Sequence, residues 1–415
     1  MLTVEEALAE ILGQVPRMPA ESAGLLETLG RVLAEEVSSP RDLPPHDVSQ
    51  MDGYAVRSED LRGACAGSPA QLSVVARSVA GRGTDRPVRE GEAARVLTGA
   101  PLPEGADAVV VQEETERDGD LLRVKVAPSP RDFVRARGAD LAAGCAALAQ
   151  GTLLGPAQIA LLASVWRSQA RVFQRPRVAV LSTGDELLDL DGLCSSGAAA
   201  AAPVPQRIID SNSWSLCAQV LAAGATPVRL GLAPDDPEAI GRALDAAARC
   251  DVVLTSAGVS VGERDFVKDV LARRGVELRF WRVAMKPGKP LAFGLKGGQL
   301  YFALPGNPTS AMVSFEQFVR PALLTMAGRR SVRRTRLMAS LEGTLAKKAG
   351  LVHFVRARSR VDAGGRLVAA PVPRQDSGLI SSMAQADSLI VLPAAVEKVA
   401  SGEAVEVQLL DGFEG

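Results

Sequence analysis

The first residues of the chain arrange hydrophobic and polar positions as in an amphipathic helix. Apolar residues recur every three or four positions from Val4 to Val15, and Thr3 and Glu6 have the spacing of a capping box. The pattern predicts a helix that begins after Thr3. A second helix is expected over residues 24–36.

After residue 40 the pattern changes to short β-rich runs separated by glycine and proline. Residues 72–80 and 108–112 are two such runs. They predict a separate β-rich domain that ends near residue 138. A helical pattern returns over residues 156–166.

From residue 177 the chain alternates apolar strands with helical patterns. The expected strands cover residues 178–181, 252–254, 278–283 and 300–304, and the expected helices cover residues 213–223, 237–249, 265–274 and 309–326. This alternation is typical of a doubly wound α/β domain. The alanine-rich segment 192–205 is expected to be a surface loop. Short strands after residue 330 indicate a small β-barrel or sandwich.

Composition limits the classes of function. With 415 residues and 47% hydrophobic content, the chain is long enough for two to four domains. Its 47 lysines and arginines balance 48 aspartates and glutamates, so no large net charge directs it to nucleic acid or to an anionic membrane. The sequence shows neither a signal-peptide pattern nor an apolar run of membrane-spanning length, so we expect a cytoplasmic protein.

The cysteines and histidines exclude several kinds of metal site. The five cysteines form no C-x-x-C pair, and only two histidines are present. Zinc ribbons, iron–sulfur clusters and most histidine-based acid/base chemistry are therefore not expected. Chemistry in this chain must rest on carboxylates, lysines, hydroxyls and backbone amides.

Three expected strands end in polar or glycine-rich turns, at residues 182–186, 256–265 and 304–310. In open α/β sheets ligands bind beyond the carboxyl ends of the strands, and glycine turns with free amides favour phosphate. Lys286 and Lys289 stand between prolines just before the third turn and can clamp an anion. Taken singly, the first turn is also explained by helix capping, the second by a plain glycine turn, and the lysines by a solvated basic turn.

Six ordered motifs together resemble the molybdopterin molybdenumtransferases, the MoeA family that includes the E domain of gephyrin. They are P-x-x-D-x-S-x-M-D-G-Y-A from Pro44, T-G-A-x-x-P from Thr98, S-T-G-D-E-L from Ser182, S-x-G-V-S-V-G-x-x-D from Ser256, K-P-G-K-P from Lys286 and L-P-G-N-P from Leu304. The order and number of the motifs make the resemblance far more specific than any one of them.

The resemblance implies a multidomain α/β fold. It predicts a helical linker domain at residues 1–43 and 141–172, an inserted β-rich domain at 44–140, a doubly wound α/β molybdopterin-binding domain at 173–328 and a C-terminal β-barrel at 329–415. It also implies a homodimer whose active sites are shared between two subunits.

The resemblance also assigns roles to individual positions. The expected catalytic residues are Asp52, Thr98, Glu186, Asp265, Lys286 and Lys289. The expected binding residues for the pterin and its phosphates are Arg135, Asp140, Thr183, Gly184, Ser256, Gly258, Ser260, Gly262, Pro305, Gly306, Asn307 and Pro308. The expected metal ligands are Asp185, Glu186, Asp235 and Asp265, although Asp236 is an alternative to Asp235.

The implied activity is molybdopterin molybdotransfer. Adenylated molybdopterin and molybdate would be the substrates, Mg²⁺ the cofactor, and molybdenum cofactor and AMP the products. Expected partners are a molybdopterin adenylyltransferase domain or protein and the molybdoenzymes that accept the product. Ala257 departs from the family by replacing its usual second glycine. The alternatives are a molybdopterin adenylyltransferase, which would not need the inserted domain, and a noncatalytic dimeric scaffold.

Overall fold

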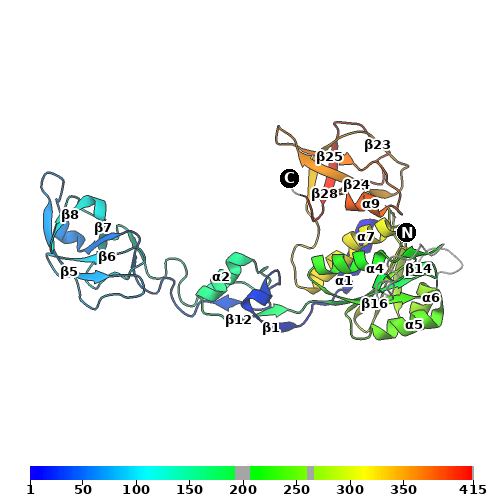
Figure 1. Cartoon of the computed structure of the whole chain (residues 1–415), viewed down its shortest axis with the longest axis horizontal. Coiled ribbons are helices and arrows are strands. Elements are labelled where there is room, and N and C mark those ends of the chain that lie inside the picture. The colour runs from blue at the N-terminus through cyan, green and yellow to red at the C-terminus, as the bar shows by residue number, and fades with distance from the viewer. Residues whose placement is uncertain (192–205, 259–265, 414–415) are drawn as a thin grey trace. The chain divides into compact units, whose positions relative to one another are not determined.

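The computed structural model describes residues 1–191, 206–258 and 266–413, and the chain forms two compact units (Figure 1). The larger unit comprises Met1–Ser22, Gly30–Ala34 and Arg171–Gly415, and the smaller unit comprises Ala23–Leu29 and Glu35–Ala170. The finer division into four domains stays a prediction. The expected loop at 192–205 lies outside the described residues. None of the described helices is long and apolar enough to cross a membrane.

A six-stranded sheet forms the centre of the larger unit. Its order is β16 (Thr226–Ala233), β13 (Arg177–Thr183), β17 (Val252–Ser256), β21 (Gln299–Leu304), β20 (Pro290–Lys296) and β18 (Glu277–Arg282). The first four strands are parallel, and β20 and β18 run antiparallel to their neighbours. All four predicted strands are confirmed. The sequence analysis missed β16 and β20, and the antiparallel β20 makes the sheet mixed.

Alternate residues of the parallel strands enter two different cores. Val180 of β13 belongs to the same core as the buried residues of the N-terminal helix, whereas Leu181 shares the other core with Ile240 and Val270. The first core is covered by α1 (Val4–Gln14), α4 (Asn212–Ala222), α7 (Pro308–Ser314) and α8 (Arg320–Met326), and the second by α5 (Pro237–Ala246) and α6 (Val267–Arg273). Helices therefore cover both faces, which confirms the doubly wound architecture.

The N-terminal helix begins as its capping box predicts. The Glu6 amide donates to the Thr3 hydroxyl over 3.2 Å, and the Glu6 carboxylate accepts from the Thr3 amide over 2.8 Å. The helix predicted over 309–326 is continuous, but a π-helical turn, Phe315–Val319, separates α7 from α8. The helix expected over 24–36 is wrong. Only a 3₁₀ turn at Leu25–Thr28 forms, and Gly30 has a φ of 73°, which ends any helix there.

The C-terminal part of the larger unit is a closed β-barrel. Its five strands are β24 (Val352–Val361), β25 (Leu367–Pro371), β22 (Arg336–Leu341), β28 (Ala404–Leu409) and β26 (Ser388–Leu392). The ring closes because β24 pairs with both β25 and β26. Short elements complete this unit: α9 (Ile380–Ala384), β14 (Leu187–Leu188), β15 (Ile208–Ile209), β19 (Met285–Lys286), β23 (Leu345–Ala346) and β27 (Lys398–Val399).

The smaller unit contains a second six-stranded sheet, as the β-rich pattern predicts. Its order is β7 (Ala108–Val111), β4 (Gly53–Val56), β6 (Glu92–Val96), β5 (Ala70–Ser78), β9 (Leu121–Val124) and β8 (Thr115–Asp118). Smaller elements are β2 (Val37–Ser38), β3 (Val48–Ser49), β10 (Val134–Arg135), β11 (Ala146–Leu148) and α2 (Pro156–Ser164), and β1 (Ala20–Gly24) pairs with β12 (Gln169–Phe173). Gly53 is required in β4, because a Cβ there would lie 2.0 Å from the Val110 carbonyl oxygen.

Candidate functional site

The carboxyl ends of β13, β17 and β21 meet at a cavity of about 630 Å³ in the larger unit. Predicted site residues from all three turns line it: Thr183, Glu186, Ser256, Gly258, Pro305, Gly306, Asn307 and Pro308. We call it the ring cavity. The parallel arrangement of the three strands accounts for this convergence, because their carboxyl ends lie at one edge of the sheet.

The turn after β13 carries two exposed acidic residues, Asp185 and Glu186, of which Glu186 lines the cavity. Gly184 has a φ of 148°, and a Cβ at this position would lie 2.7 Å from a carboxyl oxygen of Glu186. Any larger residue would therefore displace the Glu186 side chain. The Oδ1 atom of Asp185 accepts from the backbone amide of Asp235 over 3.1 Å. Asp236 instead caps helix α5, where it accepts from Ala239 over 2.7 Å, which favours Asp235 as the candidate ligand.

The turn after β17 carries the departure from the family motif. Ala257 has a φ of 80°, in the left-handed region that favours glycine, so the backbone keeps a glycine-like conformation with alanine in place. Gly258 follows with a φ of 72°, and a Cβ there would lie 2.4 Å from a methyl carbon of Val267. The candidate residues Ser260, Gly262 and Asp265 lie outside the described residues.

Two cavity residues that the sequence analysis missed hold the turns together. Asn212, at the start of α4, donates from Nδ2 to the Ser256 hydroxyl and to the Gly306 carbonyl oxygen, each over 2.7 Å. Asp210 accepts at Oδ1 from the Ser182 hydroxyl over 3.0 Å and from the Ser213 amide over 3.1 Å. The only sequence signal was Asp-Ser-Asn ahead of an apolar helix, which is typical of an ordinary N-cap.

A second cavity, of about 810 Å³, adjoins the first and contains the predicted lysines. Lys286 and Lys289 line it together with three cations that sequence reasoning missed, Lys347, Lys348 and Arg356. Asp376 is the only acidic residue of its described lining, and among described residues none of the five cations forms an ion pair with a carboxylate. We call this cavity the cationic cleft. Pro290 and Asn307 line both cavities, so the two spaces adjoin.

Burial lowers the pKa of two groups in the cleft, and for His353 the neighbouring lysines add to the effect. Burial, together with the charges of Lys286 and Lys347, lowers the pKa of His353 to about 4. Arg356 is 1% exposed, and its burial lowers its pKa. Its Nε donates to the Ser382 hydroxyl over 3.1 Å, which fixes the guanidinium in the cleft wall. Such a cleft attracts a multiply charged anion.

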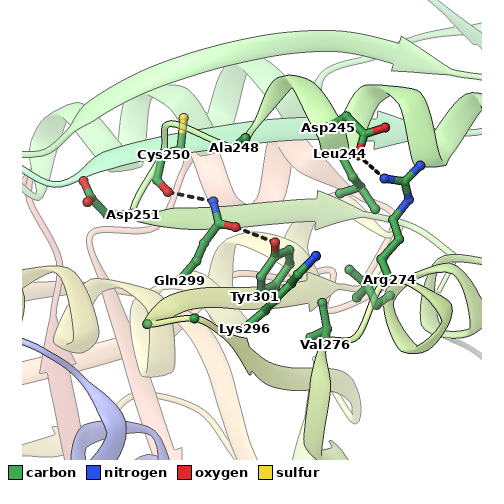
Figure 2. A pocket seen from close by; sticks show the side chains of 13 residues that line it. Leu244, Asp245, Ala248, Cys250, Asp251, Arg274, Val276, Lys296, Gln299 and Tyr301 are labelled. Carbon is green, nitrogen blue, oxygen red and sulfur yellow. Dashed lines mark hydrogen bonds and ion pairs between the residues drawn. The ribbon is translucent and has the colours of Figure 1, made fainter.

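A third cavity, of about 660 Å³, lies at the opposite, amino ends of β17 and β21 (Figure 2). Asp245 is paired with Arg274, and Gln299 donates to the carbonyl oxygens of Ala247 and Cys250 over 2.8 and 2.6 Å. Tyr301 donates to the Gln299 side chain. These groups satisfy one another, so nothing in this cavity indicates a ligand.

The smaller unit contains the four remaining candidate residues. Asp52 accepts at Oδ1 from the Thr98 amide over 2.7 Å and from the Thr98 hydroxyl over 2.9 Å. The bond from the backbone amide is the main cause of the lowered pKa of Asp52. Arg135 lies exposed in β10, and Asp140 is exposed and bonded through its backbone amide to Leu43. The structure therefore brings Asp52 and Thr98 together, and two hydrogen bonds from Thr98 fix the Asp52 carboxyl group.

No group of three or more histidine, cysteine, aspartate or glutamate side chains is placed to hold a metal ion within residues 1–191, 206–258 and 266–413. A fully protein-ligated metal centre is thus not formed by the described residues. Asp185 and Glu186 are exposed, and Glu186 lines the ring cavity, where it can act together with a ligand.

The α/β sheet with helices on both faces, the closed barrel and the β-rich unit define a multidomain α/β protein with a candidate ligand site at the carboxyl ends of its parallel strands. Residues 2–165 match the MoeA N-terminal region (domain I and II), 179–325 a probable molybdopterin binding domain, and 338–410 the MoeA C-terminal region (domain IV). The chain belongs to the molybdopterin molybdenumtransferase (MoeA) family, whose members are transferases of molybdenum cofactor biosynthesis.

Relatives cover nearly the whole chain. It is 35% identical over 412 residues to the molybdopterin molybdenumtransferase of Haemophilus influenzae, with 98% of each chain covered. It is 39% identical over 336 residues to that of a Nostoc species, which covers 79% of this chain and 75% of the relative. The crystal structure of a molybdopterin biosynthesis MoeA protein from Pyrococcus horikoshii superposes with a TM-score of 0.83 at 32% identity, over 100% of both chains.

Proposed function

We propose that this enzyme transfers molybdenum from molybdate to the dithiolene of adenylated molybdopterin and releases AMP. The proposal rests on two adjoining cavities whose linings differ in polarity and charge. The ring cavity has a polar floor and apolar walls, the cationic cleft holds five cations against one acid, and Pro290 and Asn307 belong to both. A pterin and an oxyanion can thus be held side by side.

The cleft suits molybdate. Molybdate is a dianion, and charge-assisted hydrogen bonds from lysine and arginine hold such anions more strongly than neutral donors do. Lys286 and Lys289 project from a turn whose Pro287 and Gly288 are buried, which restricts the movement of the backbone between them. We assign these two lysines to binding the oxyanion and to offsetting the negative charge that develops as the phosphate bond breaks.

The substrate supplies the soft metal ligands. The described cysteines are scattered, and none lines either cavity, so the dithiolene sulfurs rather than protein thiols would take up the molybdenum. This assignment agrees with the polar side chains that line both cavities, which offer oxygen and nitrogen atoms.

The carboxyl groups of the turn after β13 fit Mg²⁺. This ion prefers oxygen ligands and usually binds one or two carboxylates together with substrate phosphates. Asp185 and Glu186 are exposed, Asp235 lies at the Asp185 carboxyl, and these three residues would hold the ion. When bound, Mg²⁺ neutralises charge on the pyrophosphate. Asp265 belongs to the same proposed ligand set.

We further propose that the enzyme is a cytoplasmic homodimer with shared active sites. Asp52 and Thr98 would close the site of the partner subunit, and Arg135 and Asp140 would bind the substrate. Leu26 is 84% and Trp166 is 70% exposed in the smaller unit, and apolar surface of this kind favours association. A molybdopterin adenylyltransferase would supply the substrate, and molybdoenzymes would receive the product.

Release of AMP from purified adenylated molybdopterin, measured with and without molybdate, tests the proposal. We expect release that depends on molybdate. An adenylyltransferase would instead consume ATP and molybdopterin and form the adenylated pterin. A noncatalytic scaffold would do neither, and either of these outcomes would contradict the proposed function.

A further inference from the structure

The floor of the ring cavity contains three buried polar atoms without a hydrogen-bond partner among the described residues. They are Thr183 Oγ1, Asp210 Oδ2 and Asn212 Oδ1. Thr183 and Asp210 are each 1% exposed and Asn212 is 9% exposed, and all three residues line the cavity. Leaving such atoms unpaired is unfavourable, so their persistence on one cavity floor indicates a ligand that pairs with them.

The orientation of two of these acceptors is fixed by bonds on the other side of each group. Asp210 uses Oδ1 for two donors, from Ser182 and Ser213, which leaves Oδ2 as its remaining acceptor. Asn212 uses Nδ2 for Ser256 and Gly306, which sets the amide so that Oδ1 is left. Both groups therefore present acceptors, and the ligand must present donors.

The walls of the cavity suit a flat ring. Ile208 is 60%, Ile209 is 41% and Ile380 is 40% exposed, although each lines the cavity. Pro290 and Pro305 add further apolar surface. Apolar walls with a few convergent polar groups are typical of sites for heterocyclic ligands.

We propose that Asp210 and Asn212 recognise the donor edge of the substrate's pterin ring, formed by N3–H and the 2-amino group. The identity of the ring rests on the proposed function; the need for a donor edge rests on the unpaired acceptors. The Thr183 hydroxyl is then available for the neighbouring ring carbonyl. Asp210 and Asn212 thus determine specificity for a 2-amino ring, whereas the cationic cleft binds the oxyanion.

Binding of two matched probes tests this assignment. Pterin-6-carboxylate carries the 2-amino group, and lumazine-6-carboxylate carries a carbonyl oxygen in its place. Equilibrium dialysis of the full chain should show the pterin bound about tenfold more tightly or better, since a buried acceptor left facing another acceptor is costly. In Asp210→Asn the amide can donate to the lumazine carbonyl, so the preference should fall to about equal or reverse.

Asp245→Asn is the matched control, because it makes the same chemical change in the cavity at the opposite edge of the sheet (Figure 2). It should keep the wild-type preference. A merely structural role of Asp210 would weaken both probes equally and leave their ratio unchanged, which would overturn the proposal. If Asp210→Asn does not fold, the wild-type measurement is sufficient by itself: equal binding of both probes would overturn the proposal.

The dialysis experiment needs neither molybdate nor AMP release, so the two proposals can fail separately. If the chain binds the pterin much more tightly than the lumazine but releases no AMP, the recognition role of Asp210 and Asn212 is supported and the proposed transferase function is contradicted. If AMP release depends on molybdate but both probes bind equally, the transferase function is supported and the recognition role is contradicted.

Discussion

The side-chain amide of Asn212 lies 2.7 Å from the carbonyl oxygen of Gly306, so the start of α4 is fixed to the turn after β21. Its second bond, to Ser256, joins the turn after β17 to the same point. Asn212→Ala removes both bonds, each of which contributes about 0.5–1.5 kcal/mol. We expect the free energy of unfolding to fall by about 1–3 kcal/mol in urea titrations. An unchanged value would show that the turns are held by other contacts.

The glycine in the Met-Asp-Gly-Tyr motif has a packing role that a substitution can test. A Cβ on Gly53 would lie 2.0 Å from the Val110 carbonyl oxygen, within the β4–β7 pairing. Gly53→Ala should therefore lower the free energy of unfolding by about 1–3 kcal/mol or more. Gly67→Ala is the control in the same unit, because nothing lies within 4 Å of the added carbon. Equal melting temperatures for the two variants would contradict the steric explanation.

His353 reports the charge of the cationic cleft. Its pKa of about 4 is held below the ordinary value of 6.5 by burial, Lys286 and Lys347. A bound dianion would offset the lysine charges, so adding molybdate should raise the His353 pKa. The titration can be followed by proton NMR, because His46 is the only other histidine in the sequence. A pKa that does not move at saturating molybdate would show that the oxyanion binds elsewhere.

The same shift predicts how stability changes with pH. Because the folded pKa lies below the unfolded one, the unfolded chain takes up the proton first as pH falls. The contribution of His353 is therefore complete above about pH 6.5 and is lost as pH falls toward 4. His353→Gln should lose less stability than the wild type between pH 7 and 4.5. Identical pH profiles of the melting temperature would contradict this linkage.

A shared active site can be tested by mixing two inactive variants. Asp52→Ala removes a residue of the smaller unit, and Glu186→Ala removes one of the ring cavity. In a two-fold dimer with shared sites, a mixed pair has both lesions in one site and leaves the other intact. Half the dimers would be mixed, so activity should recover to about a quarter of wild type. If subunit exchange is confirmed by mass spectrometry and no activity returns, each site lies within one chain.

Sequence patterns correctly predicted the elements that depend on interactions between residues close together in the chain. The Thr3–Glu6 capping box and the apolar strand of Val178 to Leu181 are examples. The helix expected over 24–36 failed because apolar spacing there was compatible with a turn, and Gly30 takes a left-handed conformation. Helix spacing alone cannot distinguish these outcomes without the surrounding contacts.

The site was predictable where a motif ends a strand and unpredictable where the fold brings distant residues together. Lys286 and Lys289 stand in one motif, but Lys347 and Arg356 line the same cleft from the C-terminal region, which contains none of the six motifs. The sequence analysis did not single out Asp210. Only the structure shows that its second carboxyl oxygen is buried and has no hydrogen-bond partner among the described residues.

The role of the cationic cleft is tested most directly by the dependence of AMP release on molybdate in Lys289→Ala. Loss of a charge-assisted bond, of about 1.5–3 kcal/mol, should lower turnover by roughly 10- to 100-fold without changing the melting temperature. Lys296 is an exposed lysine at the opposite edge of the sheet (Figure 2), and the control variant Lys296→Ala should behave as wild type. If Lys289→Ala turns over as fast as Lys296→Ala at every molybdate concentration, the cleft does not bind the oxyanion that reacts.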